Sequence, residues 1–310
     1  MLKFDKIKIV TDIQDITIID HSSFEVTLES GKIKAQKHHQ EGPFLLNVKV
    51  DYVKNEAVLE FTGKVLGERY PELITINTIR DCFEAINHLG FCRIDIDAIL
   101  EHADVVKCDV TCDINCEDIQ SLCTYMRMHI TNYSLFRCAL LRNGNMVIEK
   151  NVTSDKCKKR MVIYDKGKEM NKAINKDFVE ANHLEGAFDG KCRFEINLNS
   201  KQQIRDSLNV SNTKLMTVLA ATANPISEFV SQVVTSQSSD VKCSSFKEYY
   251  QTLILKDCDY DLAKVEARLR SLYGAGRSIP KMMQVYRDLL DKNNGKEENE
   301  LFLAAIEQLQ

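Results

Sequence analysis

The segment RMVIYDKGKEM, residues 160–170, places a tyrosine and a lysine two positions apart, where a β-like pattern gives way to a helix-like one. The pKa of a free phenol is about 10, so Tyr164 needs help to act as a nucleophile at neutral pH. An ammonium such as that of Lys166 can stabilise a phenolate or the charge of a pentavalent phosphorus. The segment therefore predicts phosphoryl transfer to Tyr164. The plainer alternative is a packed strand tyrosine that precedes a helix.

Strand alternation predicts which polar groups share a face with this pair. On a strand, Tyr164 and Lys166 point the same way. The acidic residues that fall in polar rows of other strand-like segments are Asp109 and Asp113 (105–114), Glu195 (191–198) and Glu60 (57–64). If these strands lie in one sheet, the carboxylates form a site suited to Mg²⁺ or Mn²⁺, which prefer oxygen ligands. An antiparallel sheet with one wet face shows the same alternation without any chemistry.

The pattern along the chain predicts the elements that must hold these groups. Residues 1–66 are β-rich, residues 71–90 have helical spacing, and a hairpin with an NGN turn is expected within 133–151. Strands around Tyr164 and Glu195 alternate with helix-like segments, and from about Ser211 onward the pattern is helical. We expect an α+β fold, with a largely antiparallel central sheet, flanking helices and a helical C-terminal region. The expected domains are 1–210, catalytic, and 211–310, helical.

Composition places the chain among cytosolic globular proteins. It has 310 residues, 44% of them hydrophobic, and no segment with the roughly 20 apolar residues of a membrane helix. The eleven cysteines are scattered and include no CxxC pair, which favours reduced thiols. Cys108, Cys112 and Cys116 are evenly spaced, so a zinc site is an alternative to a core role. The adjacent His38 and His39 would face opposite ways on a strand, and we expect them in a solvated turn.

The net charge of −4 gives no global sign of nucleic-acid binding, but local clusters of basic residues do. The candidates for DNA contact are Lys158, Lys159, Arg160 and Lys168 around Tyr164, Arg193 beside Glu195, and Arg277 and Lys281 in the C-terminal region. Segments 261–273 and 279–291 predict two helices joined by a glycine-containing turn, similar to a helix-turn-helix. The alternatives are a solvated basic face around Tyr164 and ordinary packing helices in the C-terminal region.

The order of these segments resembles the phage/plasmid replication protein family, the rolling-circle initiators that include the filamentous-phage nicking proteins. The resemblance covers roughly residues 55–205 and depends on the joint order of short motifs. The matching stretches are AVLEFTGKVLGERYPELI, VVKCDVTCDI, RMVIYDKGKEM with Tyr164, Lys166 and Glu169, and KCRFEINLNS with Arg193, Phe194 and Glu195; GAGRSIPKMMQVYRDLL is more loosely similar. Lys107 and Cys108 stand where the family has arginine and isoleucine, and the His-hydrophobe-His metal pair of many rolling-circle nickases is absent.

The resemblance implies a metal-dependent nuclease that nicks one strand at a replication origin. Tyr164 would form a 5′-phosphotyrosine link and leave a free 3′-hydroxyl, and the reverse transfer would rejoin the strand. Asp109 and Glu195 would carry the Mg²⁺ or Mn²⁺, with Glu60 and Asp113 as further candidates. The implied partners are origin DNA, single-stranded or as a hairpin, and host helicase and polymerase. A non-catalytic origin-binding protein and a mobilisation relaxase are alternatives, and the oligomeric state stays open.

Overall fold

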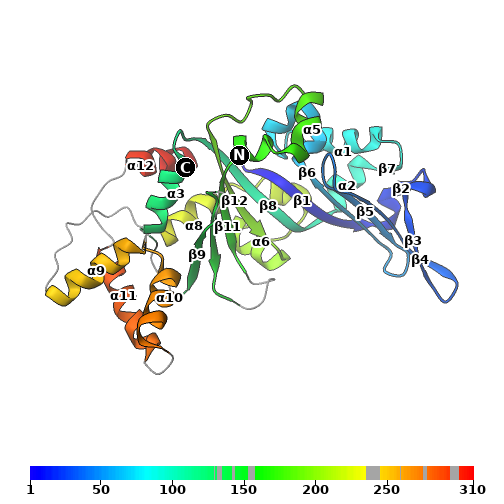
Figure 1. Cartoon of the computed structure of the whole chain (residues 1–310). Helices are drawn as coiled ribbons and strands as arrows, with labels where there is room; N and C mark the ends of the chain where they lie inside the picture. The colour runs from blue at the N-terminus through cyan, green and yellow to red at the C-terminus, as the bar shows by residue number, and fades with distance from the viewer. Residues whose placement is uncertain are drawn as a thin grey trace. The chain divides into compact units, whose positions relative to one another are not determined.

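A computed structural model describes residues 1–128, 130, 135–141, 144–152, 158–234, 245–258, 260–274, 278–293 and 300–310 (Figure 1). The chain divides into two compact units. The first consists of Met1–Asn115 and Val152–Ile226, and the second of Cys116–Asn151 and Ser227–Gln310. This division differs from the expected boundary at residue 210, because residues 116–151 belong with the C-terminal helices. The two units are described separately below.

An antiparallel sheet forms the centre of the first unit, and eight of its strands follow the order β3-β4-β5-β6-β1-β8-β12-β11. These strands are β1 (Lys3–Asp12), β3 (Glu25–Glu29), β4 (Lys32–Gln40), β5 (Leu46–Asp51), β6 (Glu56–Thr62), β8 (Asp104–Asn115), β11 (Arg160–Asp165) and β12 (Lys191–Leu198). A separate small sheet pairs β2 (Ile16–Ile18) with β7 (Cys92–Ile94). The α+β fold with a large antiparallel sheet is therefore confirmed.

Alternation of apolar and polar residues divides the sheet into a core face and a polar face. On β12 the side chains of Cys192, Phe194, Ile196 and Leu198 are fully buried. On β6, Leu59 and Phe61 are fully buried, and the ring of Phe61 packs edge-on against Phe83 at a centroid distance of 5.8 Å. The residues between them face the other side of the sheet, so the core fixes which groups gather on the polar face.

Short helices surround this sheet. They are η1 (Ile13–Asp15), η2 (His21–Ser23), η3 (Gly63–Glu72), α1 (Ile79–His88), α2 (Ile96–His102), α4 (Lys166–Met170), η4 (Ala173–Asn175), α5 (Lys176–Ala181), α6 (Lys201–Leu208) and α7 (Leu215–Leu219). Side-chain caps start several of them: Asp165 accepts a hydrogen bond from the Lys168 amide at 2.8 Å, and Ser200 accepts one from the Gln203 amide at 3.3 Å. The helix-like segment that follows Tyr164 is interrupted between α4 and η4, because Lys172 is extended there.

The second unit contains a hairpin and helices. Strands β9 (Phe136–Leu140) and β10 (Met146–Lys150) pair antiparallel, which confirms the expected hairpin. The helices are α3 (Ile119–Met128), α8 (Pro225–Val233), which begins at the end of the first unit, α9 (Phe246–Asp257), α10 (Leu262–Tyr273), α11 (Ile279–Asn293) and α12 (Glu300–Leu309). A buried cluster that includes Leu255, Val265, Leu269, Met283 and Tyr286 joins α9, α10 and α11. The helical character expected of the C-terminal region is confirmed.

One expectation about the N-terminal region changes. Residues 32–40 form β4, so His38 and His39 lie on a strand and not in a turn. His38 is half-buried and stacks on Phe91 at a centroid distance of 4.1 Å, because this side of β4 packs on an aromatic cluster.

Within the part of the chain that the structure describes, no helix is long and apolar enough to cross a membrane.

Truncation of the core face should destabilise the first unit far more than truncation of the polar face. Leu59→Ala removes a fully buried side chain, so we expect the free energy of unfolding to fall by roughly 2–5 kcal/mol. Lys8→Ala removes only a surface ion pair with Glu60 and should cost about 1 kcal/mol or less. Urea denaturation measures both values. Equal losses would contradict the assignment of the two faces.

Candidate functional site

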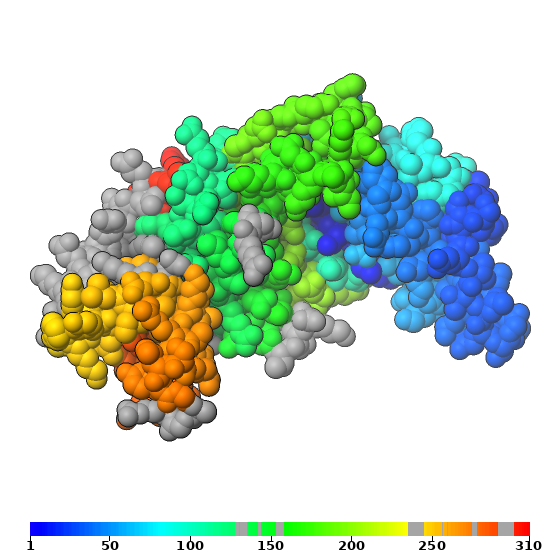
Figure 2. All heavy atoms as spheres, viewed as in Figure 1, coloured from blue at the N-terminus to red at the C-terminus, as the bar shows by residue number. Residues whose placement is uncertain are grey.

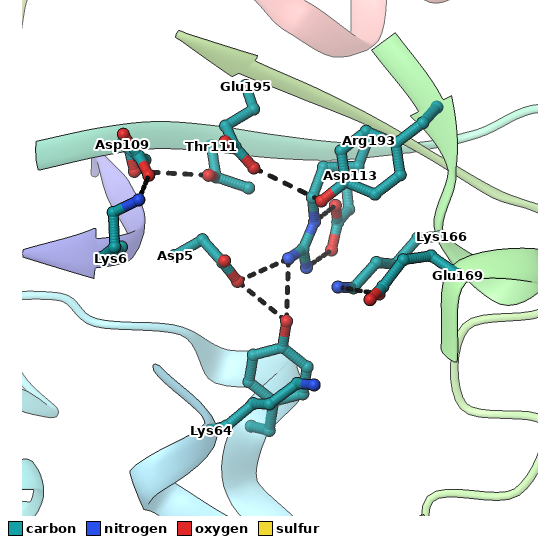
Figure 3. Close-up of polar contacts among 12 residues, drawn as sticks. Asp5, Lys6, Lys64, Asp109, Thr111, Asp113, Lys166, Glu169, Arg193 and Glu195 are labelled. Atoms are coloured by element: carbon teal, nitrogen blue, oxygen red, sulfur yellow. Dashed lines mark hydrogen bonds and ion pairs between the residues drawn. The ribbon is translucent and has the colours of Figure 1, made fainter. Parts of the chain in front are cut away.

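The register of the central strands brings the predicted polar residues together on one face of the sheet. Asp109, Thr111 and Asp113 of β8 lie opposite Asn197, Glu195 and Arg193 of β12. Tyr164 of β11 lies opposite Arg193 on the other side of β12. The grouping of Tyr164, Glu195 and Asp109 on neighbouring strands is therefore confirmed, and their chemistry stays a prediction. Figure 3 shows Asp109, Thr111 and Asp113 of β8 with Arg193 and Glu195 of β12, and the polar contacts around them.

Tyr164 is half-buried and in contact with Glu195. Its hydroxyl donates a hydrogen bond to Oε2 of Glu195 at 3.3 Å. Burial, together with the negative charge of Glu195, raises the pKa of Tyr164 well above 10. The phenol is therefore protonated at neutral pH, and the carboxylate beside it is positioned to receive its proton.

Glu195 is the carboxylate of this face that has no basic partner within ion-pair distance among the described residues. Its oxygen Oε1 accepts a hydrogen bond from the Asn197 amide at 3.0 Å, while Oε2 faces Tyr164. Burial and the negative charges of Asp5 and Asp109 raise the pKa of Glu195 to about 7. The group can therefore gain or lose a proton near neutral pH, which suits a general base or a cation ligand.

Asp109 is linked to Glu195 through Asn197. The Asn197 amide nitrogen donates to Oδ1 of Asp109 at 2.9 Å as well as to Glu195. Oδ2 of Asp109 forms an ion pair of 2.6 Å with Lys6, and the side chain of Asp109 is only 3% exposed. The two carboxylates thus share one amide donor, which holds them close together.

The strand β1 supplies two charged groups, Asp5 and Lys6, that the sequence patterns did not single out. The pairing of β1 with β8 shifts between Phe4 and Lys6, which is a β-bulge. The bulge allows the consecutive residues Asp5 and Lys6 to reach the same face, toward Arg193 and Asp109 respectively (Figure 3). The signal in the sequence is the spacing of Phe4 and Ile7: both are fully buried, although three positions apart on one strand.

Arg193 is fully buried and ties three strands together. Its guanidinium binds Asp113 through two hydrogen bonds of 2.6 and 2.7 Å, and Nη1 donates to Asp5 at 2.7 Å and to the hydroxyl of Tyr70 at 3.0 Å. Burial opposes its charge, but Tyr70, Asp5 and Asp113 raise the pKa of Arg193 well above its ordinary value. The expectation that Arg193 contacts DNA is corrected, because every part of this side chain is enclosed by protein.

Lys166 is the first residue of α4 and not a strand residue, so strand alternation does not explain its position. The side chain is 3% exposed and forms an ion pair of 2.6 Å with Glu169. Its ammonium nitrogen lies 5.2, 5.7 and 5.8 Å from the ring centroids of Tyr70, Tyr164 and Phe188. Three aromatic rings and one carboxylate thus hold the positive charge beside the phenol of Tyr164.

The segment η3 adds Tyr70 and Lys64, which the sequence reading also missed. Tyr70 is 1% exposed, and its hydroxyl donates to Asp5 at 2.8 Å. Lys64 donates to Asn175 at 2.8 Å, and burial lowers the pKa of Lys64. Both residues lie in the stretch AVLEFTGKVLGERYPELI. Because they belong to the helical segment η3, strand alternation does not predict where their side chains point.

The four carboxylates expected to hold a metal are not equivalent. Glu60 is paired with Lys8 at 3.1 Å, and both oxygens of Asp113 are bound by Arg193. Asp109 is also paired, with Lys6 at 2.6 Å, but it shares the Asn197 amide with Glu195. Asp109 and Glu195 are therefore the two carboxylates held side by side, and this pair of oxygen ligands fits Mg²⁺ or Mn²⁺ when water and a substrate phosphate complete the coordination. Across the described ranges of the chain, no cluster of three or more His, Cys, Asp or Glu has metal-binding geometry. This finding includes the evenly spaced Cys108, Cys112 and Cys116.

The basic residues proposed for DNA contact lie in different places. Around Tyr164, Lys158 and Lys159 are half-buried, Arg160 is exposed at the start of β11, and Lys168 is exposed and pairs with Asp165 at 3.2 Å. In the second unit, Lys281 is exposed on α11, while Arg277 lies outside the described residues. Helices α10 and α11 exist as expected and pack on one core cluster. Contact with DNA stays a prediction for all these residues.

Removal of the buried guanidinium should unfold the site. Arg193→Met leaves Asp5 and Asp113 without their partner, and we expect a loss of about 3–5 kcal/mol in the free energy of unfolding. Arg80→Met, which removes an exposed arginine that pairs with Asp97, is the matched control and should cost about 1 kcal/mol or less. A loss for Arg193→Met no greater than the control, measured by chemical denaturation, would contradict the role of the network.

The raised pKa of Glu195 predicts a pH-dependent stability. The folded protein keeps the proton up to pH about 7, whereas the unfolded chain releases it near 4.5. Folding stability should therefore fall as the pH rises between these values, and the loss is complete above 7. Glu195→Gln removes this loss, so with a chelator present its melting temperature should exceed that of the unmodified chain by a few degrees at pH 8 and by much less at pH 5.

Differential scanning calorimetry at the two pH values tests this expectation. Glu84→Gln, which changes an exposed carboxylate on α1, is the control and should shift the melting temperature equally at both. A shift for Glu195→Gln that is the same at pH 5 and pH 8 would show that the Glu195 carboxyl titrates normally.

No protein-family model matches the sequence, no curated protein is significantly similar to it, and no solved structure matches its fold. The polar face of the sheet, with Tyr164, Glu195 and Asp109 on adjacent strands, is therefore the main basis for inferring the function of the chain.

Proposed function

We propose that this protein initiates rolling-circle replication of a phage or plasmid as a DNA nicking-joining enzyme, with Tyr164 as its nucleophile. The observation that carries the proposal is the hydrogen bond from the Tyr164 phenol to Glu195, a carboxylate without a basic partner among the described residues. The order of the sequence motifs gives independent support. The proposed substrate is origin DNA, single-stranded or as a hairpin, and the proposed setting is the cytoplasm of a bacterial host.

The chemical step uses groups that are already in contact. Oη of Tyr164 forms a bond to phosphorus while the bond from phosphorus to the 3′ oxygen breaks. The phenol proton passes to Oε2 of Glu195, 3.3 Å away, and the released 3′ oxygen takes a proton from water. The products are a 5′-phosphotyrosine and a free 3′-hydroxyl from which a host polymerase extends. Attack by a 3′-hydroxyl on the phosphotyrosine reverses the step and rejoins the strand.

The positive charge of Lys166 assists at the phenol. Its ammonium is fixed by Glu169 and by the surrounding rings, so it does not have to be ordered when the substrate binds. Glu169 is itself held by two hydrogen bonds from the Asn175 amide, of 2.7 and 3.1 Å, to its carbonyl and carboxylate. Burial opposes its charge, but Lys166 lowers the pKa of Glu169, so the Glu169 carboxyl is ionised at neutral pH.

Asp109 and Oε1 of Glu195 are the proposed ligands of Mg²⁺ or Mn²⁺. When bound, such an ion makes the phosphate more electrophilic and stabilises the charge of the transition state. Lys6 forms an ion pair with Oδ2 of Asp109, and its movement away would free that oxygen, while Oδ1 keeps the hydrogen bond from Asn197. Glu195 has one oxygen for proton transfer and one for the metal ion, because Oε2 faces Tyr164 while Oε1 faces Asn197 and Asp109.

One observation favours a second function, that of an origin-binding replication protein without catalysis. Burial raises the pKa of Tyr164, which opposes formation of the phenolate. A protein that kept this sheet only as a DNA-binding scaffold would have the same polar network. The two functions differ in whether DNA becomes covalently attached.

Replacement of the nucleophile separates these two functions. Incubation with single-stranded DNA of the origin region and Mn²⁺ should give a denaturant-resistant protein–DNA adduct, which peptide mapping places at Tyr164. Tyr164→Phe should abolish the adduct and change DNA affinity by no more than about twofold, since only one hydroxyl is removed. Tyr52→Phe, at an exposed tyrosine of the same unit, should leave the adduct unchanged. An adduct that persists in Tyr164→Phe contradicts the proposal.

A further inference from the structure

A cavity of about 440 Å³ opens at the end of β1 and β8, in the first unit. Its apolar wall includes Phe188, Ile226 and Pro71, and its polar wall includes Asp113 and Asn224. Lys3 and Lys191 add positive charge at the lining. A cavity of this size accommodates one small ligand, and an apolar wall with a few polar groups is the usual composition of such sites. Figure 2 shows dark-blue N-terminal atoms next to the green segment around residues 170–190.

The cavity shares its walls with the network around Tyr164. Asp113 lines the cavity and also binds Arg193, which lies opposite Tyr164 on the neighbouring strand. Phe188 lines the cavity, and its ring is one of the three around Lys166. Thr111, another lining residue, lies opposite Glu195. Since neighbouring strands are about 4.8 Å apart, Asp113 and Tyr164 are separated by roughly two strand spacings, or about 10 Å.

The backbone of β8 adds hydrogen-bonding groups to this cavity. Strand β1 pairs with β8 only from Asp104 to Thr111. Cys112 and Asp113 therefore extend past the start of β1, and among the described residues no strand covers that edge. An uncovered strand edge presents N–H and C=O groups in the plane of the sheet, where a planar ligand can bind them.

We propose that this cavity binds the nucleobase of the nucleotide next to the phosphodiester that Tyr164 attacks. The proposal rests on the proposed nicking function and extends it to the recognition of one base. A nucleobase is flat and apolar on its faces, which suits Phe188 and Ile226, and polar at its rim, which suits Asn224 and the β8 edge. Lys3 and Lys191 at the lining would supply positive charge for the adjoining phosphates.

Cys112 provides a probe of occupancy, because its half-buried thiol lines the cavity. The experiment uses Tyr164→Phe, which cannot become linked to DNA, and labels thiols with N-ethylmaleimide at pH 8.5. Mass spectrometry of the digested protein then follows Cys112 separately from the other cysteines. The probes are an eight-nucleotide oligothymidylate, an oligodeoxyadenylate of equal length and an abasic strand of equal length, each at a concentration that saturates binding by fluorescence anisotropy.

The expected result is that one or both base-containing strands slow the labelling of Cys112 at least tenfold, while the abasic strand does not. Unchanged labelling under saturating DNA overturns the proposal, and so does equal protection by the abasic strand, which would show that phosphate occupies the cavity. Failure to bind any of the three strands overturns both the base site and the nicking function. Protection of Cys112 in Tyr164→Phe, with no adduct in the unmodified chain, overturns the nicking function alone.

A cavity-filling variant gives a second measurement that does not depend on the thiol. Ala187→Trp places an indole at a lining position that is exposed to solvent, so the fold should tolerate it. We expect about tenfold weaker affinity for the base-containing strands and no change for the abasic strand. Ala181→Trp, at the exposed end of α5 and outside the cavity lining, is the matched control. Equal affinities of Ala187→Trp and Ala181→Trp for the base-containing strands contradict the proposal.

Discussion

The buried guanidinium of Arg193 is the interaction on which the polar face depends. A charge with no exposed surface is very costly to desolvate unless it is fully paired, and Arg193 is paired with Asp113 on β8, Asp5 on β1 and Tyr70 on η3. These contacts fix three adjacent strands and the covering segment in one arrangement. The hydrogen-bonding geometry of arginine allows this, because its planar fork has five donors in fixed directions. The strands that Arg193 joins also carry Asp109, Glu195 and Lys6.

The ion pairs across the sheet explain why Glu195 is the carboxylate most available for chemistry. Lys6 pairs with Asp109, Lys8 pairs with Glu60, Lys166 pairs with Glu169, and Arg193 contacts both Asp113 and Asp5. In the described part of the chain, Glu195 is the acidic group of this face outside these pairs, and its pKa is raised to about 7 as a result of burial and of the neighbouring acids. A proton or a cation at Glu195 would reduce the repulsion between Glu195 and the neighbouring Asp5 and Asp109. The proposed nucleophile is the residue that shares a hydrogen with this group.

Alternation along single strands was sufficient to predict on which face of the sheet each residue lies, but not which side chains contact one another. It placed Asp109, Glu195 and Tyr164 on the polar side, because burial of Leu198, Phe194 and similar residues leaves no other choice. It did not predict that Arg193 would be enclosed, since that depends on Asp5, which reaches the face only through a bulge. It explained Lys166 wrongly, because the Asp165 cap turns the chain into a helix there. The grouping of residues 116–151 with the C-terminal helices depends on contacts between distant segments, for which a short sequence window has no signal.

The bulge in β1 has a consequence for anyone who grafts this face onto another scaffold. On a regular strand, Asp5 and Lys6 would point to opposite sides, so an idealised copy of the sheet would retain the acid or the base but not both. Loss of Asp5 leaves the guanidinium of Arg193 with one partner fewer. Loss of Lys6 leaves Asp109 beside Glu195 without its ion pair. The β-bulge in β1 is thus necessary for the charge pairing of this face, and a grafted sheet must include the bulge as well as the side chains.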